Sequence, residues 1–144
     1  LGSPLSTDRL DGARAAATAS GAALEVREGD FSIESGYRGA RSLVEAGTTA
    51  IFCFSDEMAL GALRALADMK LDCPGDVSVV GFDDIRFAAY TLPRLTTVSQ
   101  PRREIGRTTV ELLLRRLRGE GEQAASIVLP HQLVIRDSTS CPPR

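Results

Sequence analysis

The chain has 144 residues, of which 43% are hydrophobic and 25% are charged, and its formal net charge at pH 7 is -2. This length and composition are typical of one soluble globular domain. The small negative charge provides no general attraction for nucleic acid or an anionic membrane. No apolar run approaches the ~18 to 20 residues that a membrane span needs, so we expect no membrane contact and no DNA contact from this chain itself.

The first residues suggest a piece of a longer protein. The chain opens on Leu1-Gly-Ser-Pro4, without Met, in a pattern that looks like the end of a strand entering a turn. Thr7-Asp8 offers a helix N-cap, and Leu10 with the alanines after it predicts a short helix. Residues 23–26 then predict a strand, with Gly29-Asp30 as its turn.

The middle of the chain alternates between helix and strand patterns. Apolar residues at helical spacing predict a helix over 33–45, and Gly47 is a natural C-terminal stop. The run 49–54 is too short for a helix, and its continuous apolar character predicts a strand covered on both faces. Ser55 caps the next helix, and 77–82 predicts a second buried strand.

The last third continues the alternation. Residues 95–99 predict a strand, and Pro101 suits the first position of a helix that ends at Gly119. The helix is expected to bury Ile105, Thr109, Leu113 and Leu117. Residues 127–129 and 133–135 are expected to close the chain as strands. Alternating strands and helices predict an α/β fold with a parallel sheet, in which ligands bind at the carboxyl ends of the strands.

Little in the sequence would serve catalysis or metal binding. Cys53, Cys73 and Cys141 are an odd number of cysteines without metal-type spacing, and a buried free thiol in a reducing cytoplasm explains Cys53 best. The single histidine, His131, has no nearby nucleophile and is expected at the surface. No glycine-rich phosphate loop is present. We therefore expect no enzyme, no metal and no cofactor.

Three side chains are better candidates for ligand binding. Asp83 comes directly after a buried strand, where a carboxylate could accept hydrogen bonds from the hydroxyls of a polyol, sugar or ribose, or could cap the turn. Phe31 opens a helix after a strand, where its ring could stack on a sugar or nucleobase or act as a hydrophobic staple. Arg9 lies near a helix start, which disfavours a cation; a ligand, a carboxylate partner or solvent exposure would each explain it.

The helix beginning at Pro101 is rich in arginine. It carries Arg102, Arg103, Arg107, Arg115, Arg116 and Arg118. Glu104 and Glu111 are interleaved with these arginines, the leucines place them on the outer face, and aromatic residues are absent. The pattern favours a solvated face over a nucleic-acid-binding patch.

Three motifs resemble regulators of the lac/galactose repressor family. They are Ser55-Asp-Glu-Met-Ala-Leu-Gly-Ala62, Asp76-Val-Ser-Val-Val-Gly-Phe-Asp-Asp84 and Leu95-Thr-Thr-Val-Ser-Gln-Pro101, followed by Glu104-Ile-Gly106. A looser match covers Arg9-Leu-Asp-Gly12 and Glu28-Gly-Asp-Phe31. Gly-Asp-Phe-Ser, Phe-Cys-Phe-Ser-Asp and Gln-Pro-Arg are most similar to the cytidine-repressor-like branch.

The resemblance implies two Rossmann-like subdomains, similar to periplasmic binding proteins, with a small-molecule effector held between them. Residues 1–98 would be the C-terminal subdomain, truncated at its start. Residues 99–127 would be the crossover strand and helix of the N-terminal subdomain, and 128–144 the closing strands and tail. Operator DNA would be bound only by a helix-turn-helix headpiece that lies outside this chain.

The resemblance also implies residue roles. The positions that would contact a sugar or nucleoside effector are Arg9, Phe31, Ser55, Asp83 and Gln100. Arg9 and Asp83 would hydrogen-bond effector hydroxyls, Phe31 would stack on the ring, and Gln100 would lie near the hinge. Ser55 stands where several relatives have Asn. The positions that would form a homodimer interface are Met58, Leu60, Tyr90, Thr91, Leu92 and Pro93.

Together these features predict the effector-sensing part of a cytoplasmic transcription regulator. The alternative is a periplasmic sugar-binding protein of a transporter, which shares the fold and would carry a secretory signal instead of a helix-turn-helix. An enzyme is a distant third interpretation, because it rests on the carboxylates of Asp83 and Asp84 alone.

Overall fold

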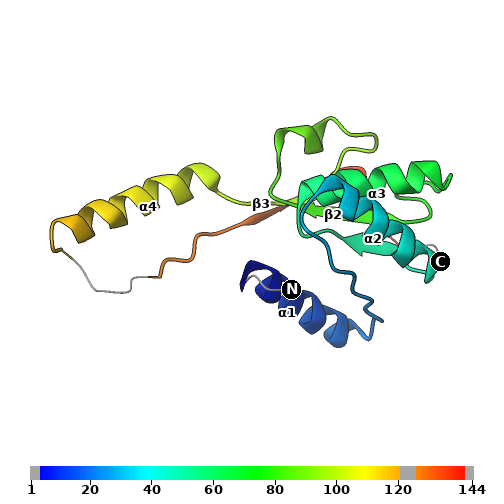
Figure 1. Cartoon of the computed structure of the whole chain (residues 1–144), viewed down its shortest axis with the longest axis horizontal. Coiled ribbons are helices and arrows are strands. Elements are labelled where there is room, and N and C mark those ends of the chain that lie inside the picture. The colour runs from blue at the N-terminus through cyan, green and yellow to red at the C-terminus, as the bar shows by residue number, and fades with distance from the viewer. Residues whose placement is uncertain (1–3, 121–125, 142–144) are drawn as a thin grey trace.

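The computed structural model describes residues 4–120 and 126–141 of the chain (Figure 1). Its elements are α1 (Pro4–Ser20), α2 (Ile33–Glu45), β1 (Ala50–Phe52), α3 (Asp56–Asp68), β2 (Ser78–Phe82), the 3-10 helix η1 (Arg86–Ala89), β3 (Thr96–Ser99), α4 (Arg102–Leu117) and β4 (Gln132–Val134). Their alternation along the chain confirms the predicted α/β class.

The strands form one sheet in the order β1-β2-β3-β4. β1, β2 and β3 are parallel, with Ile51 beside Val79 and Val80 beside Thr96, and β4 runs antiparallel to β3. Because the first three strands are parallel, their carboxyl ends meet at one edge of the sheet. The sheet is therefore mostly parallel, as predicted.

The core lies between the sheet and the helices α2 and α3. Ala62 and Leu66 of α3 are fully or almost fully buried, together with Val79 of β2. The backbones of the two helices touch, because a Cβ atom added at Gly61 would overlap the carbonyl oxygen of Ile33. Small residues thus set the distance between the helices.

Helix boundaries follow the local signals in the sequence. The hydroxyl oxygens of Ser32 and Ser55 accept hydrogen bonds from the amides of Ser35 and Met58, capping α2 and α3. Gly47 follows α2 with a φ of +87°, which a glycine adopts without strain. These caps and the stop confirm the predicted helices.

The predicted strand at residues 23–26 does not form. Leu24 and Val26 are 44% and 36% exposed, and the segment is separated from β1 by a groove of about 790 Å³. An extended segment becomes a strand only where a neighbour accepts its backbone hydrogen bonds, and the described residues provide no such neighbour. α1, which begins at Pro4 and not after Thr7-Asp8, stands apart from the sheet in the same region (Figure 1).

β1 is covered on one face only, so the expectation of burial on both faces is wrong for this strand. Ile51 faces the core and is 5% exposed, whereas the neighbouring Phe52 is 40% exposed. Successive side chains of a strand point to opposite faces. α2 and α3 therefore protect one face of the sheet and leave Phe52 open on the other.

α4 forms where a helix was predicted, but its apolar stripe is not buried. Leu113 and Leu117 are 55% and 75% exposed, Ile105 is 38% exposed, and Thr109 is exposed as well. The helix projects away from the sheet (Figure 1), so the described part of the chain offers no layer against which the stripe could pack. Pro101 is its N-cap and not its first residue.

The arginine-rich face of α4 is solvated, as predicted. Arg107 forms ion pairs with both Glu104 and Glu111, and its side chain is 60% exposed. Exposed pairs of this kind contribute little to stability, so they do not fix the position of the helix.

Residues 126–141 form one strand where two were predicted. Residues 127–129 are not a strand, and β4 begins one residue earlier than expected. Ser138 then enters the sheet between β2 and β3: its hydroxyl accepts from the Thr96 amide at 2.8 Å and donates to the Val79 carbonyl at 2.6 Å. This residue ties the tail to the middle of the sheet.

Candidate functional site

Polar side chains follow all three parallel strands. Ser55 lies beyond β1, Asp83 directly after β2, and Gln100 directly after β3. Neighbouring parallel strands bring their carboxyl ends together, and this is the edge at which such sheets bind ligands. The placement of Asp83 agrees with the sequence-based prediction.

Asp83 and Gln100 contact each other directly. The Gln100 Nε2 atom donates a hydrogen bond of 2.6 Å to Asp83 Oδ1. Among the described residues this is the only hydrogen bond that the Asp83 carboxylate accepts, so the carboxylate does not cap the turn that follows β2. One carboxylate oxygen remains available for a hydroxyl donor.

The backbone at the end of β2 adopts an unusual conformation. Asp83 has a φ of +110° and Asp84 a φ of +52°, a region that residues other than glycine rarely occupy. The Asp83 amide donates to the Val98 carbonyl at 2.9 Å. Such conformations persist only where the surroundings hold them, and they are frequent at functional sites.

Phe31 lies next to Ser55 and is 37% exposed. Its carbonyl oxygen is 3.5 Å from Ser55 Oγ, and its φ of +66° turns the chain into α2. A hydrophobic staple pairs the residue before the N-cap with the fourth helical residue. Here Ser32 is the N-cap, so that partner position is Gly36, which has no side chain to offer. The ring is thus not used as a staple.

A negative charge accompanies Phe31 at the start of α2. The amide and hydroxyl of Ser32 donate to Asp30 Oδ1 at 3.0 Å and 2.5 Å. These bonds lower the pKa of the Asp30 carboxyl to about 2. The carboxylate is therefore ionised at neutral pH, close to the exposed ring.

Arg9 reaches the same edge from α1. Its guanidinium lies 3.8 Å from the ring centroid of Phe82 and donates a hydrogen bond of 2.5 Å to the Phe54 carbonyl oxygen. The Phe52 ring packs against those of Phe54 and Phe82, at centroid distances of 5.4 and 6.5 Å. Because α1 begins at Pro4, Arg9 lies in the second turn and its contacts are with an aromatic cluster, not with the helix terminus.

Asp56 is a site residue that the sequence-based reasoning missed. Its side chain is 0% exposed, and its carboxylate accepts from the Thr97 hydroxyl at 2.5 Å and the Ile85 amide at 2.8 Å. Burial raises the pKa of this carboxyl, and the two hydrogen bonds offset part of that effect. Asp56 thereby links the start of α3 to β3 and to the loop that carries Asp83.

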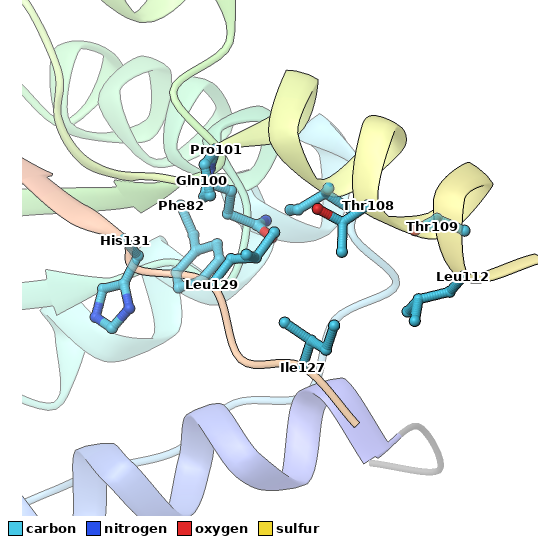
Figure 2. Close-up of a pocket in the computed structure, with 10 residues that line it drawn as sticks. Phe82, Gln100, Pro101, Thr108, Thr109, Leu112, Ile127, Leu129 and His131 are labelled. Atoms are coloured by element: carbon cyan, nitrogen blue, oxygen red, sulfur yellow. The ribbon is translucent and has the colours of Figure 1, made fainter. Parts of the chain in front are cut away.

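A cavity of about 380 Å³ opens beside Gln100, and Figure 2 shows the side chains around it. Its lining comes from the ends of β2 and β3, from α4 and from the segment before β4: Phe82, Gln100, Pro101, Ile105, Thr108, Thr109, Leu112, Ile127, Leu129 and His131. His131 lies at the border with its ring directed away from α4 (Figure 2). This lining is mostly apolar. Gln100 therefore marks the boundary between the polar residues at the carboxyl edge of the sheet and this apolar cavity.

The described residues contain no cluster of histidine, cysteine or acidic side chains that could hold a metal ion. Cys53 is buried in the core, as expected, and burial raises the pKa of its thiol to about 12. A thiol of this kind is unreactive at neutral pH. Within the same residues no helix is long and apolar enough to cross a membrane.

Comparison with known proteins adds to this geometry. Residues 2–139 match the family model of the periplasmic binding protein-like domain. The chain is 38% identical over 136 residues to the ribose operon repressor of Haemophilus influenzae, covering 91% of this chain and 41% of that repressor. It is also similar to a dimeric lac repressor structure, with a TM-score of 0.90 and 35% identity over 97% of this chain and 52% of that one.

The chain belongs to the lac/galactose repressor (LacI/GalR) family. A further LacI-family regulator, from Enterococcus faecium and solved with bound ribose, superposes with a TM-score of 0.84 and 31% identity, covering 92% of this chain and 50% of that one. The chain thus spans about half the length of these solved relatives, and less of the curated one. These relatives are named as regulators and repressors and not as enzymes, which agrees with the prediction of a non-catalytic domain.

The five positions that the LacI/GalR resemblance marks as effector contacts are not equally connected. Asp83 is bonded to Gln100, and Ser55 contacts the backbone of Phe31. Arg9 reaches them through the ring of Phe82, which precedes Asp83, and through the carbonyl oxygen of Phe54, which precedes Ser55. The structure therefore brings all five toward the carboxyl edge of the sheet and bonds only some of them to each other.

The loop between β2 and β3 carries the exposed apolar side chains expected of a LacI/GalR dimer surface. Tyr90 and Leu92 are 73% and 96% exposed, and Phe87, which the sequence-based reasoning missed, is 66% exposed. The other expected contacts, Met58, Leu60, Thr91 and Pro93, are half-buried. Met58 also packs against the core, so the loop is the more accessible part of the expected dimer surface.

Proposed function

We propose that this chain is the effector-sensing part of a LacI/GalR transcription regulator, and that a sugar or nucleoside binds at the carboxyl edge of its sheet. The observation that carries the proposal is the pair formed by Asp83 and Gln100 at 2.6 Å. The two side chains end adjacent parallel strands, where α/β sheets bind their ligands. Membership of the LacI/GalR family supports a regulator over a periplasmic transport protein.

The chemistry of the edge fits a ligand with vicinal hydroxyls. The free oxygen of Asp83 accepts from one hydroxyl, and the Gln100 amide and the Ser55 hydroxyl serve as further partners. The exposed ring of Phe31 stacks on the apolar face of a sugar or on a base. Support comes from relatives named as a ribose operon repressor and as a regulator with bound ribose.

Arg9 has a different part in this proposal. Its guanidinium is held by the Phe54 carbonyl and the Phe82 ring, and it donates to an effector hydroxyl by sharing or exchanging the Phe54 bond. The Arg9 guanidinium already lies against the ring of Phe82, the residue before Asp83. A small movement of the Arg9 side chain is therefore enough to reach the effector. Helix α1, which carries Arg9, would then move together with the bound effector.

The remaining features fit the larger regulator. We assign residues 1–98 to the C-terminal subdomain, 99–127 to the crossover and helix of the N-terminal subdomain, and 128–144 to the closing strands and tail. The exposed stripe of α4 would pack within the N-terminal subdomain. The protein would be a cytoplasmic homodimer, in which effector binding changes subdomain closure and the spacing of operator-binding headpieces.

The site is tested by isothermal titration of the full-length gene product with D-ribose, cellobiose and cytidine. We expect one of these probes to bind, and Asp83→Ala to weaken that binding at least tenfold because the hydroxyl acceptor is lost. Asp11→Ala is the control, since Asp11 is an exposed acid on α1 paired with Arg14. Unchanged affinity in Asp83→Ala would refute the site.

A further inference from the structure

We propose that Arg136 is a positioning residue for Asp83. By pairing with Asp84, it holds the end of β2 in the left-handed conformation that turns the Asp83 carboxylate toward Gln100. This inference rests on the proposed function and deepens it. Arg136 lies outside the carboxyl edge of the sheet, yet it would control the position of Asp83, a proposed ligand contact. Arg136 lies 52 residues after Asp84 in the sequence, just beyond β4.

The Arg136–Asp84 ion pair is short and protected from solvent. Arg136 Nη2 lies 2.6 Å from Asp84 Oδ1, and the two side chains are only 16% and 23% exposed. The guanidinium is itself fixed, because Nη1 donates to the Leu95 carbonyl at 2.7 Å and the Arg136 amide donates to the Thr96 hydroxyl at 2.9 Å. Water and salt screen such a pair far less than an exposed one.

The other atoms of Asp84 are held as well. Its amide lies 3.4 Å from the Thr97 hydroxyl, and its carbonyl accepts a bond of 2.8 Å from Arg102 at the start of α4. The next amide, of Ile85, is bound by the buried Asp56. One residue therefore joins β3, the start of α4 and the segment after β4.

The strain at Asp83 and Asp84 explains why the pair matters. Both residues have positive φ angles, which cost free energy for a residue with a side chain and persist only under external restraint. Without Arg136, the half-buried Asp84 carboxylate loses its cation and moves toward solvent. The peptide units then relax to negative φ, and Asp83, which is adjacent, turns away from Gln100.

A neighbouring ion pair provides a matched control. Arg94 and Asp137 also join the segment before β3 to the segment after β4, through two hydrogen bonds of 2.6 and 3.0 Å. Their side chains are 59% and 50% exposed, and neither bonds the loop at residues 83–84. Neutralising Arg94 removes a similar interaction without touching Asp84.

The test is a mutant cycle on the full-length gene product, titrated with D-ribose. We expect Arg136→Gln and Asp84→Asn each to weaken binding at least tenfold, and the double variant to be no weaker than either single one, because both remove the same restraint. Arg136→Lys should recover part of the loss, and Arg94→Gln should bind like the wild type. Wild-type affinity in Arg136→Gln, with binding lost in Asp83→Ala, would overturn the inference and leave the proposed function intact. Wild-type affinity in Asp83→Ala would instead overturn the proposed function.

Amide hydrogen exchange of the ligand-free protein tests the positioning role of Arg136 independently. If D-ribose does not bind, this experiment alone decides whether the inference holds. The Asp83 and Asp84 amides should exchange at least tenfold faster in Arg136→Gln than in the wild type, while the Val79 amide in β2 keeps its rate. Arg94→Gln should leave all three rates unchanged. Equal rates at Asp83 and Asp84, or a rise that includes Val79, would contradict a local positioning role.

Discussion

In the proposed site, a few side chains at the carboxyl edge of the sheet determine which ligand can bind. The Gln100 amide satisfies one oxygen of the Asp83 carboxylate and leaves the other open, which makes the pair an acceptor for a hydroxyl and a weak site for an anion. The exposed Phe31 ring adds an apolar surface. A neutral ligand with hydroxyls on one side and an apolar face on the other matches this arrangement.

Leu92 offers a test of the proposed dimer surface at the scale of one residue. Its side chain is 96% exposed, so Leu92→Asp should not disturb the fold, but it would place a charge in an apolar interface. Sedimentation velocity of the full-length gene product should show a dimer dissociation constant that is higher by about tenfold or more. Lys70→Asp, at an exposed lysine just after α3 and outside the loop, serves as the control. A Leu92→Asp protein as dimeric as the control would contradict this surface.

Contact between α2 and α3 positions Phe31 and Ser55, since each of these residues stands before one of the two helices. The helices approach until their backbones touch, because glycines lie at the contact. A Cβ atom at Gly61 would collide with the backbone of Ile33 and Tyr37, which cannot move independently of α2. The distance between α2 and α3 therefore determines how Phe31 and Ser55 are placed relative to each other.

Replacing glycines tests this spacing. Gly61→Ala should lower the free energy of unfolding by about 3 kcal/mol or more, because the helices must separate. Gly39→Ala, in α2, should be neutral or stabilising by up to about 1 kcal/mol, since the atom nearest to its new Cβ lies 3.9 Å away. Urea denaturation of both variants measures the difference. Equal stabilities would show that the helices are not in tight contact.

Local signals in the sequence were sufficient to predict most elements, because caps and apolar runs act over a few residues. The Ser55 cap, the strand at 77–82 and the position of Asp83 were predicted in this way. The role of Asp56 was not, because its partners Thr97 and Ile85 lie 41 and 29 residues away. The burial of α4 and the strand at 23–26 were predicted wrongly, since an amphipathic or extended pattern does not reveal whether a neighbouring layer is present.

At the scale of the whole molecule, the open surfaces lie where a larger regulator would continue. α4 exposes its apolar stripe, the segment at 23–26 has no strand beside it among the described residues, and Phe52 is uncovered on its face of the sheet. The loop at the proposed ligand-binding edge is tied to the start of α4 by Arg102, which donates a hydrogen bond to the Asp84 carbonyl. A ligand that changes the loop can therefore influence the segments that lead to the rest of the protein.

The most direct measurement of the sensing function is the affinity of the full-length gene product for a DNA site selected from genomic DNA, with and without a sugar that binds it. Fluorescence anisotropy should show that the sugar changes DNA affinity at least fivefold in the wild type and has no effect in Asp83→Ala, which is consistent with typical allosteric coupling of about 1–3 kcal/mol. A protein that binds the sugar but holds DNA with unchanged affinity, or binds no DNA site, would contradict the account.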